Sequence, residues 1–264
     1  MIASDVVTLL HLFRTLQCSC ARRGAGRVHA SSGTAHDGVI AALDTAVGEI
    51  LDTLESEGMA DNTLVVFAND NGGKKDYGND PFRGNKATFY EGGIRVPFAL
   101  KWPGKIEAGS LCHEMVSTLD LLPTFSAVAG IELPVDLVLD GQNLMPFLDG
   151  SATGLRQTHF WRNGGCVAMR SGDWKLVWPA NRKKQRKLLE TLGIKPFKGR
   201  RVVEAERDRD LFDAPQLYNL RTDIGETTDM AAQQPEQLAR MIKLVEQWES
   251  TLPKWNGVPH REGQ

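Results

Sequence analysis

The hydrophobic pattern of the first half of the chain predicts a helix followed by two strands. Apolar residues recur at three- and four-residue spacing over residues 37–58, which predicts an amphipathic helix that ends at Gly58. A nearly unbroken apolar run over residues 63–67 is typical of a strand buried on both faces of a parallel sheet. A second apolar strand is expected over residues 98–102. These elements predict a helix-to-strand unit of a doubly wound sheet.

A second helix is predicted over residues 117–128. Ser117 or Thr118 can cap its N-terminus, and Pro123 lies near its first turn, where proline is tolerated. Gly130 is expected to end the helix. The apolar residues that it carries are Leu121, Leu122 and Phe125.

The pattern changes after Gly150 to short strand-like segments. Residues 166–170 and 174–178 flank a Ser-Gly-Asp turn, which predicts an antiparallel hairpin. Residues 218–220 are a further strand candidate, and residues 236–252 form a predicted closing helix with one apolar face. We therefore predict three parts: an unstructured or misassigned N-terminus (1–33), part of an α/β domain (34–150), and a small subdomain with antiparallel strands and a terminal helix (151–264).

Composition excludes several classes of function. A chain of 264 residues with 41% hydrophobic content can bury a real core, and its formal net charge of −2 argues against general affinity for nucleic acid or acidic membranes. No apolar run reaches the length of a membrane span. The four cysteines have neither a zinc spacing nor the density of a disulfide framework, so free thiols are favoured over a single bridge.

Two polar residues at the end of the first predicted strand are candidate metal ligands. Asp70 and Asn71 follow the strand directly, at the end where ligands bind in open α/β sheets. Carboxylate and amide oxygens are the ligands that Ca²⁺ or Mg²⁺ prefers. The alternative is an ordinary turn, because Asp-Asn-Gly is a common turn sequence.

Several strings resemble the sulfatases, the arylsulfatase-like branch of the alkaline phosphatase superfamily. NDNGG, RGNKATFYEGGIRVP and FALKWPGKI resemble the middle of these proteins, and LDLLPTFSAVAGIELP and MRSGDWKLV continue the resemblance in the same order. It implies an α/β fold with an alkaline-phosphatase-like sheet flanked by helices, truncated at the N-terminus, and a small C-terminal antiparallel α+β subdomain. The implied activity is hydrolysis of aryl or carbohydrate sulfate esters.

The resemblance also implies roles for individual residues. Asp70 and Asn71 match metal-ligand positions, for Ca²⁺ with Mg²⁺ as the alternative, and Lys86 matches the lysine that contacts the sulfate, a catalytic and substrate-binding role. An isolated lysine is by default a solvated loop residue. We interpret Glu91 and Arg95, in the same motif, as a structural ion pair that shapes the loop.

The nucleophile of the family has no counterpart in the sequence. Sulfatases attack sulfur with a formylglycine made within Cys/Ser-x-Pro-Ser-Arg, and this string is absent; the nearest approach, at Cys18, lacks the proline. His29 and His36 lack the proline that follows the family's histidine, so neither is assigned its role. The alternative hypothesis is therefore a noncatalytic fragment that binds at most a cation or an anionic sugar, and we expect no turnover by the isolated chain. A phosphoryl-transfer relative is disfavoured.

The resemblance implies a sulfated small molecule or a sulfated carbohydrate as partner, and no nucleic acid. The basic tract over residues 183–201 is interpreted as a solvated loop, with a local electrostatic guide for a sulfated sugar as the alternative. Many sulfatases are secreted, periplasmic or lysosomal, but Asp5 precedes the only apolar run of the N-terminus, which is not the pattern of a signal peptide. Compartment and oligomeric state are left open.

Overall fold

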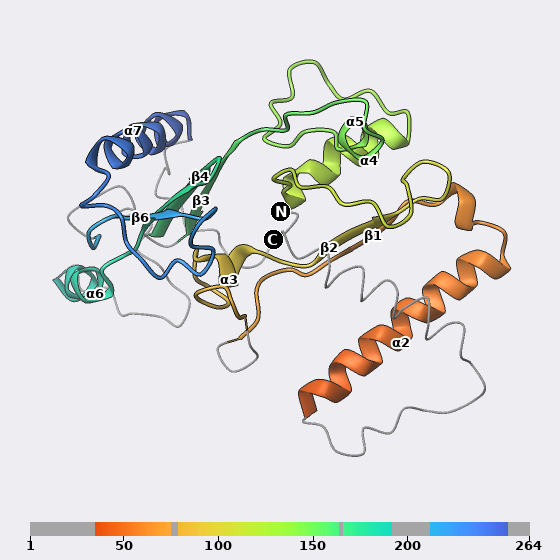
Figure 1. The fold of residues 1–264 in the computed structure, drawn as a ribbon, viewed down its shortest axis with the longest axis horizontal. Coiled ribbons are helices and arrows are strands. Elements are labelled where there is room, and N and C mark those ends of the chain that lie inside the picture. Colours follow the sequence, from red (N-terminus) through yellow and green to blue (C-terminus); the bar gives the residue numbers. More distant parts are fainter. Residues whose placement is uncertain (1–34, 75–78, 164–165, 192–211, 253–264) are drawn as a thin grey trace. The chain divides into compact units, whose positions relative to one another are not determined.

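The computed structural model describes residues 35–74, 79–163, 166–191 and 212–252 (Figure 1). The predicted N-terminal segment over residues 1–33 lies outside them. The chain divides into two compact units that interleave along the sequence. Residues 1–70 and 96–155 form the first unit, and residues 71–95 and 156–264 form the second. Neither unit is a single continuous stretch of sequence, because residues 71–95 belong with the C-terminal part.

The first unit opens with the predicted helix, α2 (Ala35–Ser56), and continues through the short 3₁₀ helix η1 (Ala60–Asn62) to β1 (Val65–Ala68). β1 pairs antiparallel with β2 (Phe98–Lys101), and its residues are half-buried or exposed. Within the described residues, the prediction that this strand is parallel to its neighbour and buried on both faces is therefore wrong. Although a long connection joins the two strands, β2 runs in the opposite direction to β1. Among the described strands, β1 pairs with β2 alone.

A capped helix completes the first unit. Ser117 caps η2 (Thr118–Asp120) in a reciprocal capping box with Asp120, and α4 (Leu121–Val128) follows, which confirms the predicted helix and its cap. Of the apolar residues that this helix carries, Leu122 and Phe125 are exposed. The residues of α4 that are buried are Pro123, Thr124 and Ser126. The core beside α4 and the short α5 (Met145–Leu148) is formed by Phe98, Val116, Leu144 and Leu155.

The second unit is built on a four-stranded antiparallel sheet with the order β3-β4-β5-β6. Its strands are β3 (Thr158–Asn163), β4 (Cys166–Ser171), β5 (Trp174–Trp178) and β6 (Gln216–Asn219). The predicted hairpin is confirmed as β4 and β5, in which Ser171 pairs with Trp174. Gly172 begins the turn between them with φ +57, a backbone angle that glycine adopts without strain.

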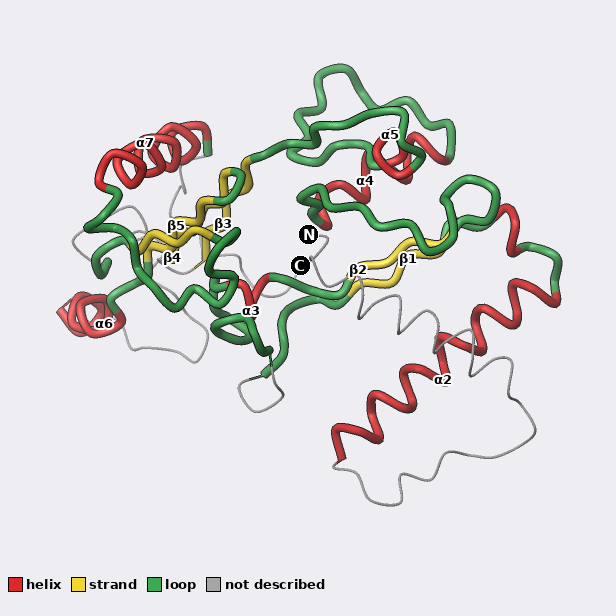
Figure 2. Tube along the Cα trace, in the orientation of Figure 1, coloured by secondary structure: helices red, strands yellow, loops and turns green. Residues whose placement is uncertain are grey.

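The two faces of this sheet are covered by different segments. The predicted closing helix is confirmed as α7 (Pro235–Thr251), which lies beside the sheet (Figure 2). Its buried residues Met241 and Val245 pack against the face that carries Val167, Leu176 and other alternate residues. The opposite face carries Ala168, Val177, Tyr218 and Leu220, and it packs against Phe89 and Tyr90. Phe89 and Tyr90, which lead into the short helix α3 (Glu91–Ile94), therefore cover the face opposite α7.

One helix of the second unit was not predicted. Residues 182–191 form α6 (Arg182–Thr191), where the sequence pattern indicated a solvated loop. Its described basic side chains are exposed, as expected of a solvated tract. The rest of the basic tract, including Lys195, Lys198, Arg200 and Arg201, lies outside the described residues.

Candidate functional site

The loop that carries Asn71 and Lys86 is closed by backbone hydrogen bonds. The Lys86 backbone N–H donates to the Gly73 carbonyl at 2.9 Å, and the Gly72 N–H donates to the Gly93 carbonyl at 3.1 Å. Lys86 is thus tied to the residues that directly follow Asn71, while its side chain is exposed. Asp70, also exposed, is the last residue of the first unit and precedes Asn71 in the chain.

Asn79 organises the loop from within. Its Oδ1 accepts from the Gly73 N–H at 2.9 Å, and its Nδ2 donates to the carbonyls of Gly73 at 3.3 Å and Gly84 at 3.1 Å. One amide side chain therefore bridges both ends of the segment that leads to Lys86. Sequence analysis missed Asn79, because an asparagine in a loop rich in glycine and lysine has no distinguishing pattern.

The loop leaves no room for side chains at several of its glycines and holds one alanine in an unusual conformation. A Cβ on Gly93 would meet the Thr88 carbonyl and would lie 2.6 Å from the Asn85 carbonyl, and a Cβ on Gly72 would meet the Gly92 carbonyl. Ala87, directly after Lys86, has φ +73, which costs roughly 1–2 kcal/mol for a residue with a Cβ. Strained backbone of this kind is concentrated at functional sites.

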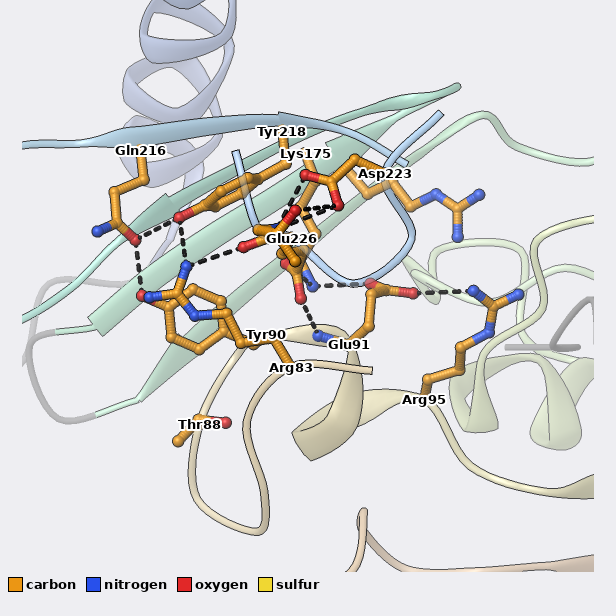
Figure 3. Close-up of polar contacts among 12 residues, drawn as sticks. Arg83, Thr88, Tyr90, Glu91, Arg95, Lys175, Gln216, Tyr218, Asp223 and Glu226 are labelled. Atoms are coloured by element: carbon orange, nitrogen blue, oxygen red, sulfur yellow. Dashed lines mark hydrogen bonds and ion pairs between the residues drawn. The ribbon is translucent and has the colours of Figure 1, made fainter. Parts of the chain in front are cut away.

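A buried cluster of charges lies between this loop and the sheet (Figure 3). The predicted ion pair is confirmed: Arg95 Nη1 lies 3.3 Å from Glu91 Oε2. Lys175 Nζ, which reaches Glu91 from strand β5, lies 2.7 Å from Glu91 Oε1 and 3.0 Å from Glu226 Oε1. The side chains of Glu91, Lys175 and Glu226 are completely buried. The contact to Glu226 Oε1 is an ion pair without hydrogen-bond geometry.

The two carboxylates of this cluster have opposite pKa shifts. Burial by itself raises the pKa of Glu91, but the charge and hydrogen bond of Lys175, together with the charge of Arg95, bring it below its ordinary value. For Glu226 the burial dominates and raises the pKa, despite the nearby Lys175 ammonium and the hydrogen bond from the Glu91 N–H. The charge of Glu91 raises it further. Glu91 is therefore the more firmly ionised of the pair.

A second set of contacts fastens the loop to the edge strand β6. Arg83 Nη1 donates to the Tyr218 hydroxyl at 2.8 Å and to the Glu226 carbonyl at 2.9 Å, and its guanidinium lies 4.1 Å from the centre of the Tyr90 ring. Both tyrosine hydroxyls donate to Gln216 Oε1, from Tyr90 at 2.6 Å and from Tyr218 at 3.0 Å. Burial raises the pKa of Tyr218 to about 12, so this hydroxyl keeps its proton at neutral pH.

The predicted metal ligands are a chemically suitable but small set. The Asp70 carboxylate and the Asn71 amide supply hard oxygen atoms, and Asn71 Nδ2 donates to the Gly72 carbonyl at 3.0 Å, which leaves the amide oxygen on the other side of the group. Within the described residues, no group of three or more His, Cys, Asp or Glu side chains is arranged to hold a metal ion. The metal site stays a prediction.

The other chemically distinctive residues lie elsewhere or outside the described part. Cys112 and Cys166 are half-buried, neither forms a disulfide bond with another described residue, and burial raises the pKa of the Cys112 thiol. His113 is exposed and His159 is buried in β3. Cys18 lies outside the described residues. None of the helices in the described ranges has the length and apolar character needed to cross a bilayer.

Comparison with known families identifies the class of protein. Residues 14–131 match the family model described as Sulfatase, and residues 155–259 match the model described as the C-terminal region of aryl-sulfatase. Together the two models account for most of the chain in the expected order. The chain belongs to the sulfatase family.

Individual relatives agree with this assignment. A steryl-sulfatase of Rattus norvegicus is 43% identical over 44% of this chain and 22% of its own length. Arylsulfatase H of Homo sapiens is 32% identical over 77% of this chain and 38% of its own length. The human N-acetylgalactosamine-6-sulfatase is 30% identical over 80% of this chain and 42% of its own length. The chain thus spans less than half the length of these relatives.

A solved structure shows the same fold. The crystal structure of Ps i-CgsB superposes with a TM-score of 0.61 at 29% identity, over 79% of this chain and 41% of that chain. This similarity confirms the predicted α/β fold of the sulfatases. The antiparallel strands of the second unit are part of that mixed architecture.

Proposed function

We propose that this chain carries the anion-binding and metal-ligating residues of a site that hydrolyses sulfate esters. Lys86 contacts the sulfate, and Asp70 and Asn71 hold a divalent cation, Ca²⁺ or alternatively Mg²⁺. The observation that carries the proposal is the hydrogen bond from the Lys86 N–H to the Gly73 carbonyl. It holds the backbone of a cationic residue beside the residues that directly follow Asn71, in a chain of the sulfatase family.

The chemistry of these side chains suits a sulfate ester. The exposed Lys86 ammonium is a compact charge that can contact a sulfate oxygen and stabilise negative charge on the leaving group. A bound divalent cation would supply neutralisation of the sulfate oxygens. Asn79 and the buried cluster restrain the described backbone around Lys86, so less ordering of this backbone is needed when substrate binds.

The substrate class is a sulfated small molecule or a sulfated carbohydrate. The names of the relatives support both, since one is a steryl-sulfatase and another an N-acetylgalactosamine-6-sulfatase. The residues identified above recognise the sulfate group, which both classes share.

The alternative function is binding without turnover. Two oxygen-bearing side chains fall well short of the roughly six to eight ligands of Ca²⁺, and the sequence has no formylglycine motif. On this alternative the chain binds a cation weakly, or an anionic sugar, through Lys86. We expect no hydrolysis of an aryl sulfate by this chain alone.

Calorimetric titration with sodium sulfate tests the proposal. Lys86→Ala is expected to weaken sulfate binding by about tenfold or more, because a charge-assisted contact is lost. Lys243→Ala, which removes an exposed lysine from α7, is the matched control and should leave binding unchanged. Equal affinities for wild type and Lys86→Ala would refute the role of Lys86.

A second titration with calcium chloride tests the ligand pair. Asp70→Ala should abolish the calcium signal, whereas Asp61→Asn, an exposed acidic residue of η1, should retain it. Turnover of an aryl sulfate is measured alongside. A calcium-dependent rate that disappears in Lys86→Ala would establish an enzyme and overturn the expectation that this chain alone is inactive.

A further inference from the structure

We infer that Lys175 and Glu226 are positioning residues that hold residues 79–95 against the sheet and thereby fix the position of the Lys86 backbone. The inference deepens the proposed function and takes its meaning for sulfate binding from it. Neither residue touches the predicted ligand positions. Both act through Glu91, which belongs to the same hydrogen-bonded segment as Lys86.

Lys175 is placed for this task by the alternation of strand β5. Its neighbours Trp174 and Leu176 pack toward α7, so Lys175 projects from the opposite face, which residues of the segment 79–95 cover. The ammonium is completely buried and lies within 3.0 Å of two carboxylates. A lysine is almost never fully buried unless it is paired. Keeping Lys175 paired with Glu91 therefore requires a fixed distance between β5 and α3.

Glu226 is held from three directions. Its Oε2 accepts from the Glu91 N–H at 2.6 Å, its Oε1 faces Lys175, and its carbonyl accepts from Arg83 Nη1 at 2.9 Å. Its backbone has φ +51, an angle that is unfavourable for every residue with a Cβ. Such a conformation persists only where the surrounding contacts over-determine it. Glu226 is therefore a fixed point to which both Arg83 and Glu91 are attached.

A short chain of hydrogen bonds leads from this point to Lys86. The Gly92 N–H donates to the Arg83 carbonyl at 2.7 Å, and the Gly93 carbonyl accepts from the Gly72 N–H at 3.1 Å. Gly73 then accepts from the Lys86 N–H. Holding Glu91 in place therefore restrains α3. Through the hydrogen bond between Gly93 and Gly72, it also restrains Gly73, to which the Lys86 N–H is bonded.

The role is geometric, because burying a charge cluster is a poor way to gain stability. The desolvation of buried ions offsets much of their attraction, and apolar residues of similar volume often stabilise a protein equally well. A buried ammonium between two carboxylates does, however, specify one arrangement, since any other leaves a charge unpaired. The cluster accordingly selects one position of the segment.

Hydrogen exchange on the full chain tests the inference with Glu226→Gln. This variant keeps the size of the side chain but removes one of its two acceptors, so either Lys175 or the Glu91 N–H loses a partner. Amides of residues 82–94 are expected to exchange about tenfold faster, with β4 and β5 unchanged. Glu190→Gln, which breaks an exposed ion pair on α6, is the matched control and should change neither. Unchanged exchange in 82–94, or an equal increase throughout the second unit, would overturn the inference.

A binding cycle separates positioning from general stability. Glu226→Gln should weaken sulfate binding about tenfold, and it should have no further effect in a Lys86→Ala background, because the two residues act on one contact. An equal loss in both backgrounds would contradict positioning through Lys86. If Lys86→Ala alone leaves sulfate binding intact, the proposed function fails, and the exchange experiment still decides whether the cluster holds the segment.

Glu226→Gly distinguishes the cluster from its backbone strain. Glycine relieves the positive φ, so a purely conformational role predicts slower or unchanged exchange in residues 82–94. The inference predicts faster exchange there, because the contacts to Glu91 and Lys175 are gone. Slower or unchanged exchange in this variant would refute it.

Discussion

Replacing Lys175 with methionine is the perturbation with the largest expected effect on the second unit. Methionine keeps an unbranched chain of similar length but removes the charge between Glu91 and Glu226. Two buried carboxylates then face each other with reduced compensation: Glu91 keeps Arg95 at 3.3 Å, and Glu226 keeps the Glu91 N–H at 2.6 Å. We expect the free energy of unfolding to fall by about 3–5 kcal/mol, the cost of removing one partner from a buried pair.

Urea unfolding followed by tryptophan fluorescence measures this loss. Trp161, Trp174 and Trp178 lie in the sheet that Lys175 belongs to, so the signal reports on the right unit. A loss of this size corresponds to a melting temperature lower by roughly 6–20 °C for a domain of this length. Glu190→Gln should change the free energy of unfolding by less than about 0.5 kcal/mol, because its ion pair with Arg186 is exposed.

A compensated variant decides whether charge is the cause. In Lys175→Met/Glu226→Gln the remaining charges, Glu91 and Arg95, balance, so we expect this variant to recover roughly half or more of the stability lost in Lys175→Met. A Lys175→Met variant within about 1 kcal/mol of wild type would refute the reasoning. So would a Lys175→Met/Glu226→Gln variant as unstable as the single one, since the loss would then come from packing.

Two further predictions concern pH and the tight glycine packing. Because burial raises the pKa of Glu226, its contribution to stability is present below its unfolded pKa of about 4.3 and is lost as pH rises through the folded value. The lowered pKa of Glu91 gives the reverse: its contribution is present above about 4.3 and is lost as pH falls through the folded value. Urea unfolding between about pH 3 and pH 7 measures how much larger the free energy of unfolding of wild type is than that of each variant. As pH rises, this difference should fall for Glu226→Gln and rise for Glu91→Gln. The same dependence on pH for both variants would contradict both assignments. Gly93→Ala should destabilise by about 1–3 kcal/mol, because its Cβ meets backbone carbonyls, whereas Gly38→Ala in α2, with open space around it, should stabilise by about 0.5–1 kcal/mol. Thermal melts compare the two, and a Gly93→Ala protein as stable as wild type would show that the loop yields easily.

Local patterns predicted much of the fold. The period of apolar residues identified α2 and α7, Ser117 as a candidate cap marked the start of the next helix, and Gly172 marked the turn of the β4–β5 hairpin. The ion pair of Glu91 and Arg95 was predictable because its members are four residues apart. Each of these features depends on residues that are close in sequence.

Features set by distant parts of the chain were missed or predicted wrongly. The direction of the partner of β1 is decided by how the chain returns at Phe98, and an apolar run alone does not contain that information. Lys175 and Glu226 meet Glu91 across 84 and 135 residues of sequence. The one available signal was a lysine inside an apolar strand that is buried on both faces. α6 was missed because its charged residues have no apolar period.

The most direct test of the central claim is an NMR titration of the full chain, labelled with ¹⁵N at lysine side chains, with sodium sulfate. The account predicts that the Lys86 ammonium signal shifts and saturates, that the buried Lys175 signal stays in place, and that the exposed lysines of α6 shift only in proportion to added salt. A saturating shift on the α6 lysines with none on Lys86 would contradict the account and assign sulfate recognition to the basic helix.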